Sequence, residues 1–100
     1  MIQSFRIEPE AEAELLAAAA WYESKRPGLG VELVATIDGA IDEILAAPEA
    51  NPLWRKNHPY RRRRVPRFPY VIFYTASETA VKVVAFAHAK REPGYWLTRA

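Results

Sequence analysis

The sequence contains no cysteine, which excludes a disulfide, a thiolate nucleophile and a zinc site built on thiolates. It also lacks a long apolar segment. The longest uncharged apolar stretch, residues 15–22, has eight residues, whereas a membrane helix needs about 20. The first residues lack the basic start and apolar middle of a signal peptide. We therefore expect a cytoplasmic protein without a membrane segment.

The composition is that of an ordinary globular chain, with 50% hydrophobic and 26% charged residues among 100. We expect one domain, residues 1–100, with a modest core. The charges are divided unevenly: residues 1–50 carry three basic and ten acidic side chains, and residues 51–100 carry eleven and two. This asymmetry predicts either an anionic partner for the second half or neutralisation between the halves, and the sequence leaves both open.

Hydrophobic spacing predicts a short strand at residues 3–7 followed by two helices. The first helix starts at Pro9, which suits a first helical turn, and stops at residues 25–30 because these contain proline and glycine. The second carries an apolar stripe over residues 33–45 and ends at Pro48. The short connection between them predicts an antiparallel helical hairpin.

After a loop at residues 48–59 the hydrophobic period changes from 3.6 to 2. Residues 60–65, 68–75 and 80–88 are rich in β-branched and aromatic residues and predict three strands joined by short hairpin connections. The last strand is apolar on both faces, so we expect it at the centre. The predicted fold is α+β, a two-layer β-α-α-β-β-β domain with a helical hairpin packed on a small, mainly antiparallel sheet.

Four consecutive arginines occupy the second predicted strand. Successive side chains in a strand point to opposite faces, which puts Arg61 and Arg63 on one face and Arg62 and Arg64 on the other. The pair beneath the helices needs carboxylates, such as those of Glu10 or Glu14, or a place at the edge of the sheet. The sequence does not decide which pair faces outward.

Three segments resemble the ParE/RelE superfamily of toxins from bacterial type II toxin–antitoxin modules. They are AAAWYESKRPGLG, RRRRVPRFPYVIFY and VVAFAHAKREPGYWLTR. The resemblance covers nearly the whole chain and is closest to the ParE-like, plasmid stabilisation branch. It implies a RelE/ParE-like fold, a cognate antitoxin and a toxin–antitoxin hetero-oligomer.

The resemblance also implies growth arrest, by a route that differs between branches. ParE-like members are DNA gyrase inhibitors, whereas RelE-like members cleave mRNA on the ribosome. The ribonuclease branch carries an arginine in a Tyr-Arg-x-x-Tyr pattern, and Val71 stands at that position here. Because loss of one such donor commonly costs about 10²–10³ in rate, we expect a non-enzymatic gyrase poison.

Two alternatives remain at this point. A metal-free endoribonuclease, with RNA and ribosome contact, would use His88, Arg91 and Tyr95 as catalytic residues. A detoxified relative would survive as a binding or co-repressing partner. For His88 we favour a structural or partner-contact role over catalysis.

We expect the antitoxin to bind basic and aromatic residues of the sheet and the tail. These are Arg61, Arg62, Arg63, Arg64, Arg67, Lys90, Arg91 and Trp96. We expect no cofactor and no metal, because the two histidines are thirty positions apart without a cysteine and no glycine-rich phosphate loop follows a strand.

Overall fold

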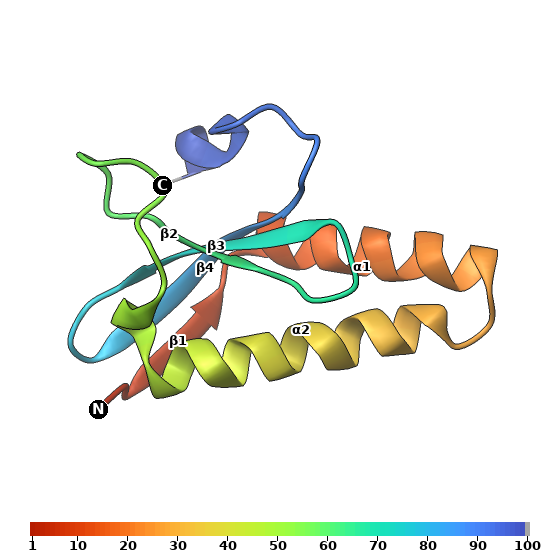
Figure 1. Ribbon diagram of the computed structural model, residues 1–100, viewed down its shortest axis with the longest axis horizontal. Coiled ribbons are helices and arrows are strands. Elements are labelled where there is room, and N and C mark those ends of the chain that lie inside the picture. Colours follow the sequence, from red (N-terminus) through yellow and green to blue (C-terminus); the bar gives the residue numbers. More distant parts are fainter. Residues whose placement is uncertain (100) are drawn as a thin grey trace.

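A helical hairpin packs against one face of a four-stranded sheet in the computed structural model, which describes residues 1–99 (Figure 1). The elements follow the predicted order: β1 (Ser4–Ile7), α1 (Pro9–Lys25), α2 (Leu29–Ala46), β2 (Arg61–Arg64), β3 (Tyr70–Ala76) and β4 (Ala80–His88). Two short 3₁₀ helices, η1 (Pro48–Ala50) and η2 (Tyr95–Arg99), complete the fold. The predicted two-layer α+β class is therefore confirmed.

The strands lie in the order β1-β4-β3-β2, so β4 is central as its apolar pattern predicted. β1 runs parallel to β4, while the β3–β4 and β2–β3 pairs are antiparallel. Five consecutive residues of β4, 83–87, are buried, because helices cover one face and η2 with the loop before β2 covers the other. β1 pairs only with the first part of β4, ending at Ile7 opposite Val83.

The two helices bury the faces that their hydrophobic spacing predicted. α1 buries Ala11 and Ala18, whereas the stripe of α2 buries larger side chains: Leu33, Ile37, Ile41 and Ile44. The turn between the helices is held by Glu23, whose carboxylate accepts the backbone N–H groups of Gly28 and Gly30 at 2.8 and 2.9 Å. These hydrogen bonds satisfy donors at the N-terminus of α2 that have no partner within the helix.

The connection between β2 and β3 is longer than the sequence predicted. Residues 65–69 lie outside both strands, whereas the prediction left only 66–67 between them. Pro66 and Pro69 cannot donate a ladder hydrogen bond, so the strands cannot extend through them. Phe68 instead turns under the helices, where it is 9% exposed and its ring centroid lies 5.1 Å from that of Tyr22.

The tail forms η2 directly after Pro93 and Gly94. Gly94 has a φ of 80°, a conformation that favours glycine, and it turns the chain back toward the sheet. Figure 1 shows η2 on the opposite side of the sheet from α2. Among the described residues, no helix is both long and apolar enough to cross a membrane.

Candidate functional site

The four arginines of β2 are divided between the two faces of the sheet. The first and third lie opposite Tyr74 and Ile72 of β3, and these two are buried in the core beneath the helices. The second and fourth point to the other face, and their side chains are exposed. The outward pair is therefore Arg62 and Arg64.

The inward pair is hydrogen-bonded within the chain. Arg61 donates to the backbone carbonyl oxygens of Asn51 at 2.7 Å and Glu49 at 3.5 Å. Arg63 donates to Oδ1 of Asn51 at 3.4 Å and forms an ion pair with the carboxylate of Glu43 on α2. Both guanidinium groups are half-buried, so these partners offset part of their desolvation.

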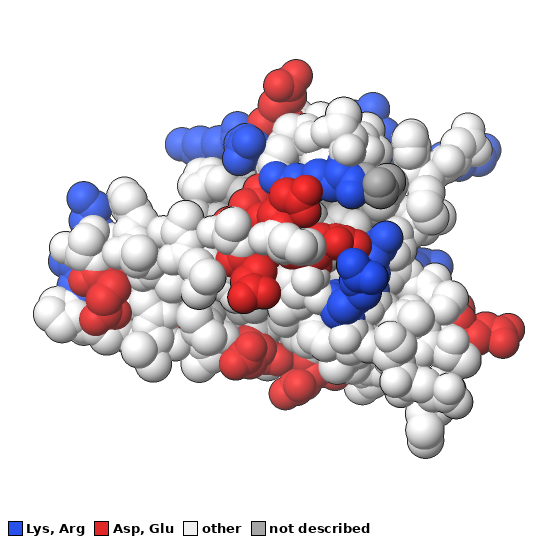
Figure 2. All heavy atoms as spheres, turned by 180° about the vertical axis from the view of Figure 1, so that it is seen from behind, with Lys and Arg blue, Asp and Glu red and all other residues white. Residues whose placement is uncertain are grey.

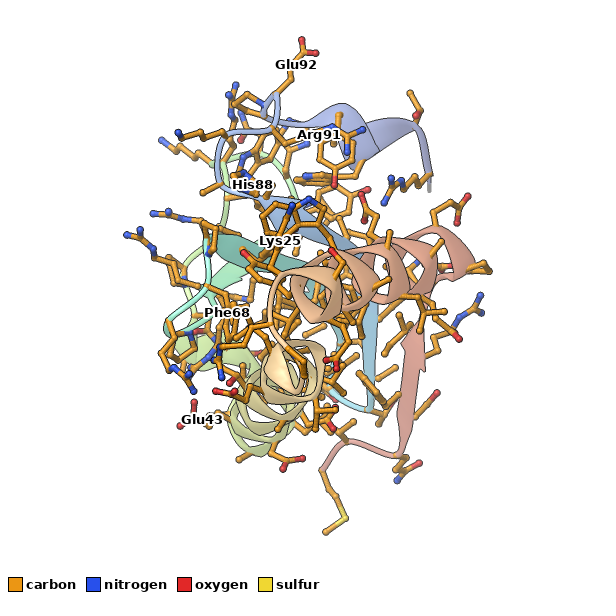
Figure 3. All side chains as sticks on the ribbon, turned by 90° about the vertical axis from the view of Figure 1, so that its right-hand side faces the viewer. Lys25, Glu43, Phe68, His88, Arg91 and Glu92 are labelled. Carbon is orange, nitrogen blue, oxygen red and sulfur yellow. The ribbon has the colours of Figure 1, made fainter. Side chains whose placement is uncertain are left out.

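Of the two possibilities that the sequence left for the inward pair, a place at the edge of the sheet is confirmed, whereas the carboxylates of Glu10 and Glu14 are not its partners. β2 is an edge strand at the far side of the sheet from β1, and the carboxylate it meets belongs to α2. Figure 3 shows Glu43 on the α2 side and away from α1. Glu14 of α1 instead binds groups from β4 and the tail.

The outward arginines have no ion-pair partner among residues 1–99, and the same holds for Lys90. Arg62 borders a hollow of about 170 Å³ whose opposite wall includes residues 87–89. Figure 3 shows nitrogen-tipped side chains projecting from this β2–β3 side of the molecule. We call Arg62, Arg64 and Lys90 the outward cationic group.

Arg67 lies at the turn of the β2–β3 connection and binds a helix. Its guanidinium donates to Glu32 of α2 at 2.8 Å, and Arg26 binds the same carboxylate at 3.1 Å. The hydrogen bond from Arg67 lowers the pKa of the Glu32 carboxyl below its usual value, and Arg26 adds to that effect. Arg67 also has a φ of 71°, a conformation uncommon for residues other than glycine.

Aromatic side chains form the core beneath the outward face. The Trp96 ring lies 4.6 Å from Phe73, 4.6 Å from Tyr60 and 4.9 Å from Trp54, measured between ring centroids. Trp96 is 1% exposed. This corrects the expectation of a direct partner contact, because Trp96 belongs to the core in the free chain.

A carboxylate of α1 joins the tail to the sheet. Glu14 accepts hydrogen bonds from Arg99 at 2.8 and 3.1 Å, from the Tyr95 hydroxyl, and from the backbone N–H of Phe86 at 3.2 Å. β1 pairs with β4 only as far as Val83, so the Phe86 N–H has no hydrogen-bond partner from β1. Arg91 approaches the same carboxylate at 3.9 Å. We call this arrangement the Glu14 centre.

The Glu14 centre alters the titration of two of its members. Burial raises the pKa of the Tyr95 hydroxyl, and the hydrogen bond to Glu14 raises it further. The hydrogen bond to Glu14 also raises the pKa of Arg99. Figure 2 shows acidic side chains gathered in the middle of the α1 side of the molecule, with basic side chains beside them.

Sequence reasoning missed the Glu14 centre. The sequence suggested Glu14 only as a partner for the arginines of the second predicted strand, and Arg99 follows Glu14 by 85 positions. One signal was available: Glu14 lies between Ala11 and Ala18 on the apolar face of α1. A carboxylate on a buried face requires a cationic or hydrogen-bonding partner.

The candidate catalytic residues His88, Arg91 and Tyr95 are near one another in the sequence, but their side chains contact different partners. Nδ1 of His88 accepts the backbone N–H of Lys90 at 3.1 Å, and the His88 ring lies edge-on to Tyr70. Arg91 stacks on the Tyr95 ring at 3.8 Å. Because the Tyr95 hydroxyl binds Glu14 and its pKa is raised, it is a poor candidate for a general base.

Val71 lies on the outward face, opposite Arg64. The structure therefore places an apolar side chain where the ribonuclease pattern requires a phosphate-binding arginine. Within residues 1–99, no group of three His, Cys, Asp or Glu side chains could hold a metal ion.

Comparison with known proteins identifies the family. The family model described as the ParE toxin of the type II toxin–antitoxin system parDE matches residues 5–93. The chain belongs to the ParE toxin family. It is therefore the toxin component of a type II toxin–antitoxin module.

A solved structure has the same fold as this ParE-family chain. It is titled as a chromosomal ParDE toxin–antitoxin system from P. aeruginosa and matches with a TM-score of 0.74. The match covers 87% of this chain and 96% of that one at 15% sequence identity, so it concerns the fold alone. A search of the curated proteins gave no match.

Proposed function

We propose that this ParE-family toxin arrests growth by binding DNA gyrase, and that a cognate antitoxin neutralises it by forming a hetero-oligomer. The family match over residues 5–93 carries the proposal. Two features of the chain favour binding over RNA cleavage. Val71 cannot stabilise a dianionic phosphate, and the Tyr95 hydroxyl already binds Glu14.

We assign the outward cationic group to the antitoxin. Its three members are exposed and lack carboxylate partners within residues 1–99. An arginine fork binds a carboxylate with two parallel hydrogen bonds, which suits an acidic segment of a partner. We assign Arg61, Arg63 and Arg67 to support of the fold, because each donates at least one hydrogen bond to another group of the chain.

A supercoiling assay tests the proposed target. Purified toxin should inhibit gyrase, and the antitoxin encoded beside the toxin gene should restore supercoiling. Unaffected supercoiling at toxin concentrations that arrest growth would refute the gyrase assignment. New 5′ ends in ribosome-bound message, lost on His88→Ala, would instead favour the ribonuclease alternative.

A charge-reversal experiment tests the outward cationic group. We expect the double variant Arg62→Glu/Arg64→Glu to bind the antitoxin at least about tenfold more weakly by calorimetry, and with a smaller dependence on salt. Lys56→Glu is the control, because Lys56 is exposed in the loop before β2 and forms no ion pair within residues 1–99. Equal affinity of all three proteins would exclude this surface.

A further inference from the structure

A pocket lies between the C-terminal half of α1 and the end of the β3–β4 pair. Its volume is about 390 Å³, near the lower end of the roughly 300–1,000 Å³ typical of ligand pockets. The small side chains of Ala17 and Ala18 leave the space, and Phe86 forms part of the lining on the sheet. We call this hollow the α1 pocket.

The aromatic wall of the α1 pocket is already in place in the free chain. Trp21 lies edge-on to Tyr22 at 4.9 Å, Tyr22 to Tyr70 at 6.4 Å, and Tyr70 to His88 at 5.3 Å. Trp21 is nevertheless 56% exposed, a large apolar area left to solvent beside a hollow. A preformed site loses little conformational entropy on binding, and tryptophan is enriched among residues that dominate binding energy.

The mouth of the α1 pocket carries more positive than negative charge. The titratable and charged groups of its lining are Glu14 and Tyr22 from α1, Tyr70 from β3, His88 at the end of β4 and Arg91 just after it. Glu14 already binds Arg99. Arg91 is 55% exposed and only 3.9 Å from that carboxylate, while Lys25 lies 5.0 Å over the Trp21 ring.

In Figure 3, Lys25 lies on the C-terminal end of α1, whereas His88 and Arg91 come from the segment at the end of β4. His88 also borders the hollow beside Arg62, so a path around the end of β4 joins the pocket on the helix face of the sheet to the outward cationic group on the other face. A single extended segment can therefore reach both. An apolar anchor with acidic neighbours has the chemistry that matches this path.

We propose that the α1 pocket binds one bulky apolar side chain of the antitoxin, and that Arg91 and Lys25 bind an acidic residue next to it. This inference rests on the proposed toxin function. It assigns the antitoxin to the sheet side of α1 and not to the apolar groove on its other side, where Ala20 faces Val31 and Val34 of α2.

A single introduced cysteine tests the pocket without disturbing folding, because the chain contains no cysteine of its own. Ala17→Cys places a thiol on an exposed position of the pocket lining, and the folded protein is then modified with N-ethylmaleimide. We expect the Kd for the cognate antitoxin to rise at least about tenfold on modification, as when a dominant contact is blocked. When the thiol is instead blocked with a methylthio group, removal of that group by a reductant should restore the original Kd.

Ala20→Cys is the matched control. It lies one turn further along α1, is exposed, and lines the groove on the other side of the helix. Modified Ala20→Cys should bind the antitoxin as the unmodified protein does. Weakening at Ala20 with none at Ala17, or equal weakening at both, would overturn the pocket assignment.

The acidic neighbour is tested separately at Arg91. Arg91→Glu should weaken antitoxin binding at least about tenfold, whereas Arg91→Lys should retain most of it. Equal affinity of both variants would overturn the charged part of the inference.

The two levels of the proposal fail differently. An unmodified toxin that neither arrests growth nor binds the antitoxin would refute the toxin function. Growth arrest relieved by an antitoxin that binds modified Ala17→Cys unchanged would refute only the pocket.

Discussion

Replacement of Glu14 by glutamine should strongly destabilise the fold. The substitution keeps the shape of the side chain and removes the charge that Arg99, Tyr95 and the Phe86 amide share. The side chains of Glu14 and Arg99 are each 16% exposed, so solvent replaces the lost interaction poorly. Hydrogen bonds to charged groups contribute about 1.5–3 kcal/mol each and do not add when they share an acceptor, so we expect a loss of about 2–3 kcal/mol.

The loss is measurable by urea unfolding and by thermal unfolding. For a domain of this size, about 1 kcal/mol shifts the Tm by roughly 4–8 °C, so Glu14→Gln should lower the Tm by roughly 10–20 °C. Glu12→Gln is the control, since Glu12 is exposed on α1 and forms no ion pair within the described chain. It should change the free energy of unfolding by less than about 0.5 kcal/mol.

A double-mutant cycle separates the ion pair from a general effect of altering α1. Combining Glu14→Gln with Arg99→Gln should give a coupling free energy between about 0.5 and 3 kcal/mol. A Glu14→Gln variant within about 0.5 kcal/mol of the parent would show that the Glu14 centre behaves as an ordinary surface ion pair, and would refute the reasoning.

Three further predictions concern stability. Gly30→Ala should lower the free energy of unfolding in urea by about 1–3 kcal/mol, because the added Cβ would lie 2.5 Å from the Ala19 carbonyl oxygen. Gly39→Ala should raise it by about 0.5–1 kcal/mol, because nothing lies within 4 Å of the added Cβ. A change of the same sign in both variants would contradict this reasoning. The lowered pKa values of Glu23 and Glu32 give stability that is present above their ordinary value of 4.5 and is lost as pH falls below it, so Glu23→Gln should flatten the acid limb of a stability–pH curve. The raised pKa of Tyr95 gives stability that is present below its ordinary value of 10.0 and is lost as pH rises above that value. Tyr95→Phe should therefore reduce the loss of stability at alkaline pH. The same alkaline loss in the variant and the parent would count against this role of Tyr95.

The fold was predictable because each element has a local signal. The 3.6-residue stripe of α2 and the two-sided apolar pattern of β4 predict a buried helix face and a central strand. The predicted strand boundaries are wrong where a tertiary contact overrides the local pattern. Phe68 continues a strand pattern in the sequence, but it packs against Tyr22 and leaves the sheet.

The candidate site was predictable only in part, because side-chain partners depend on which elements meet. Strand alternation predicts that the arginines split into two pairs, but the choice of outward pair depends on the register of β2 with β3. The carboxylate that Arg63 meets depends on α2, rather than α1, lying over that edge of the sheet. Neither the register of β2 nor the position of α2 over that edge can be derived from the spacing of residues in the sequence.

The charge asymmetry of the sequence permitted internal neutralisation or an anionic partner, and the structure separates the two by residue. Arg63, Arg67 and Arg99 of the basic half bind carboxylates of α1 and α2. Two looser pairs, Lys82 with Glu8 at 3.6 Å and Arg91 with Glu14 at 3.9 Å, add to the neutralisation between the halves. The cations left without such partners in the described part of the chain include Arg62 and Arg64, which are exposed on one face. No internal ion pair among residues 1–99 accounts for these two exposed arginines, so an acidic partner would form new ion pairs there. Reversing the charge of Arg62 and Arg64 is therefore the most direct test of antitoxin binding at this surface.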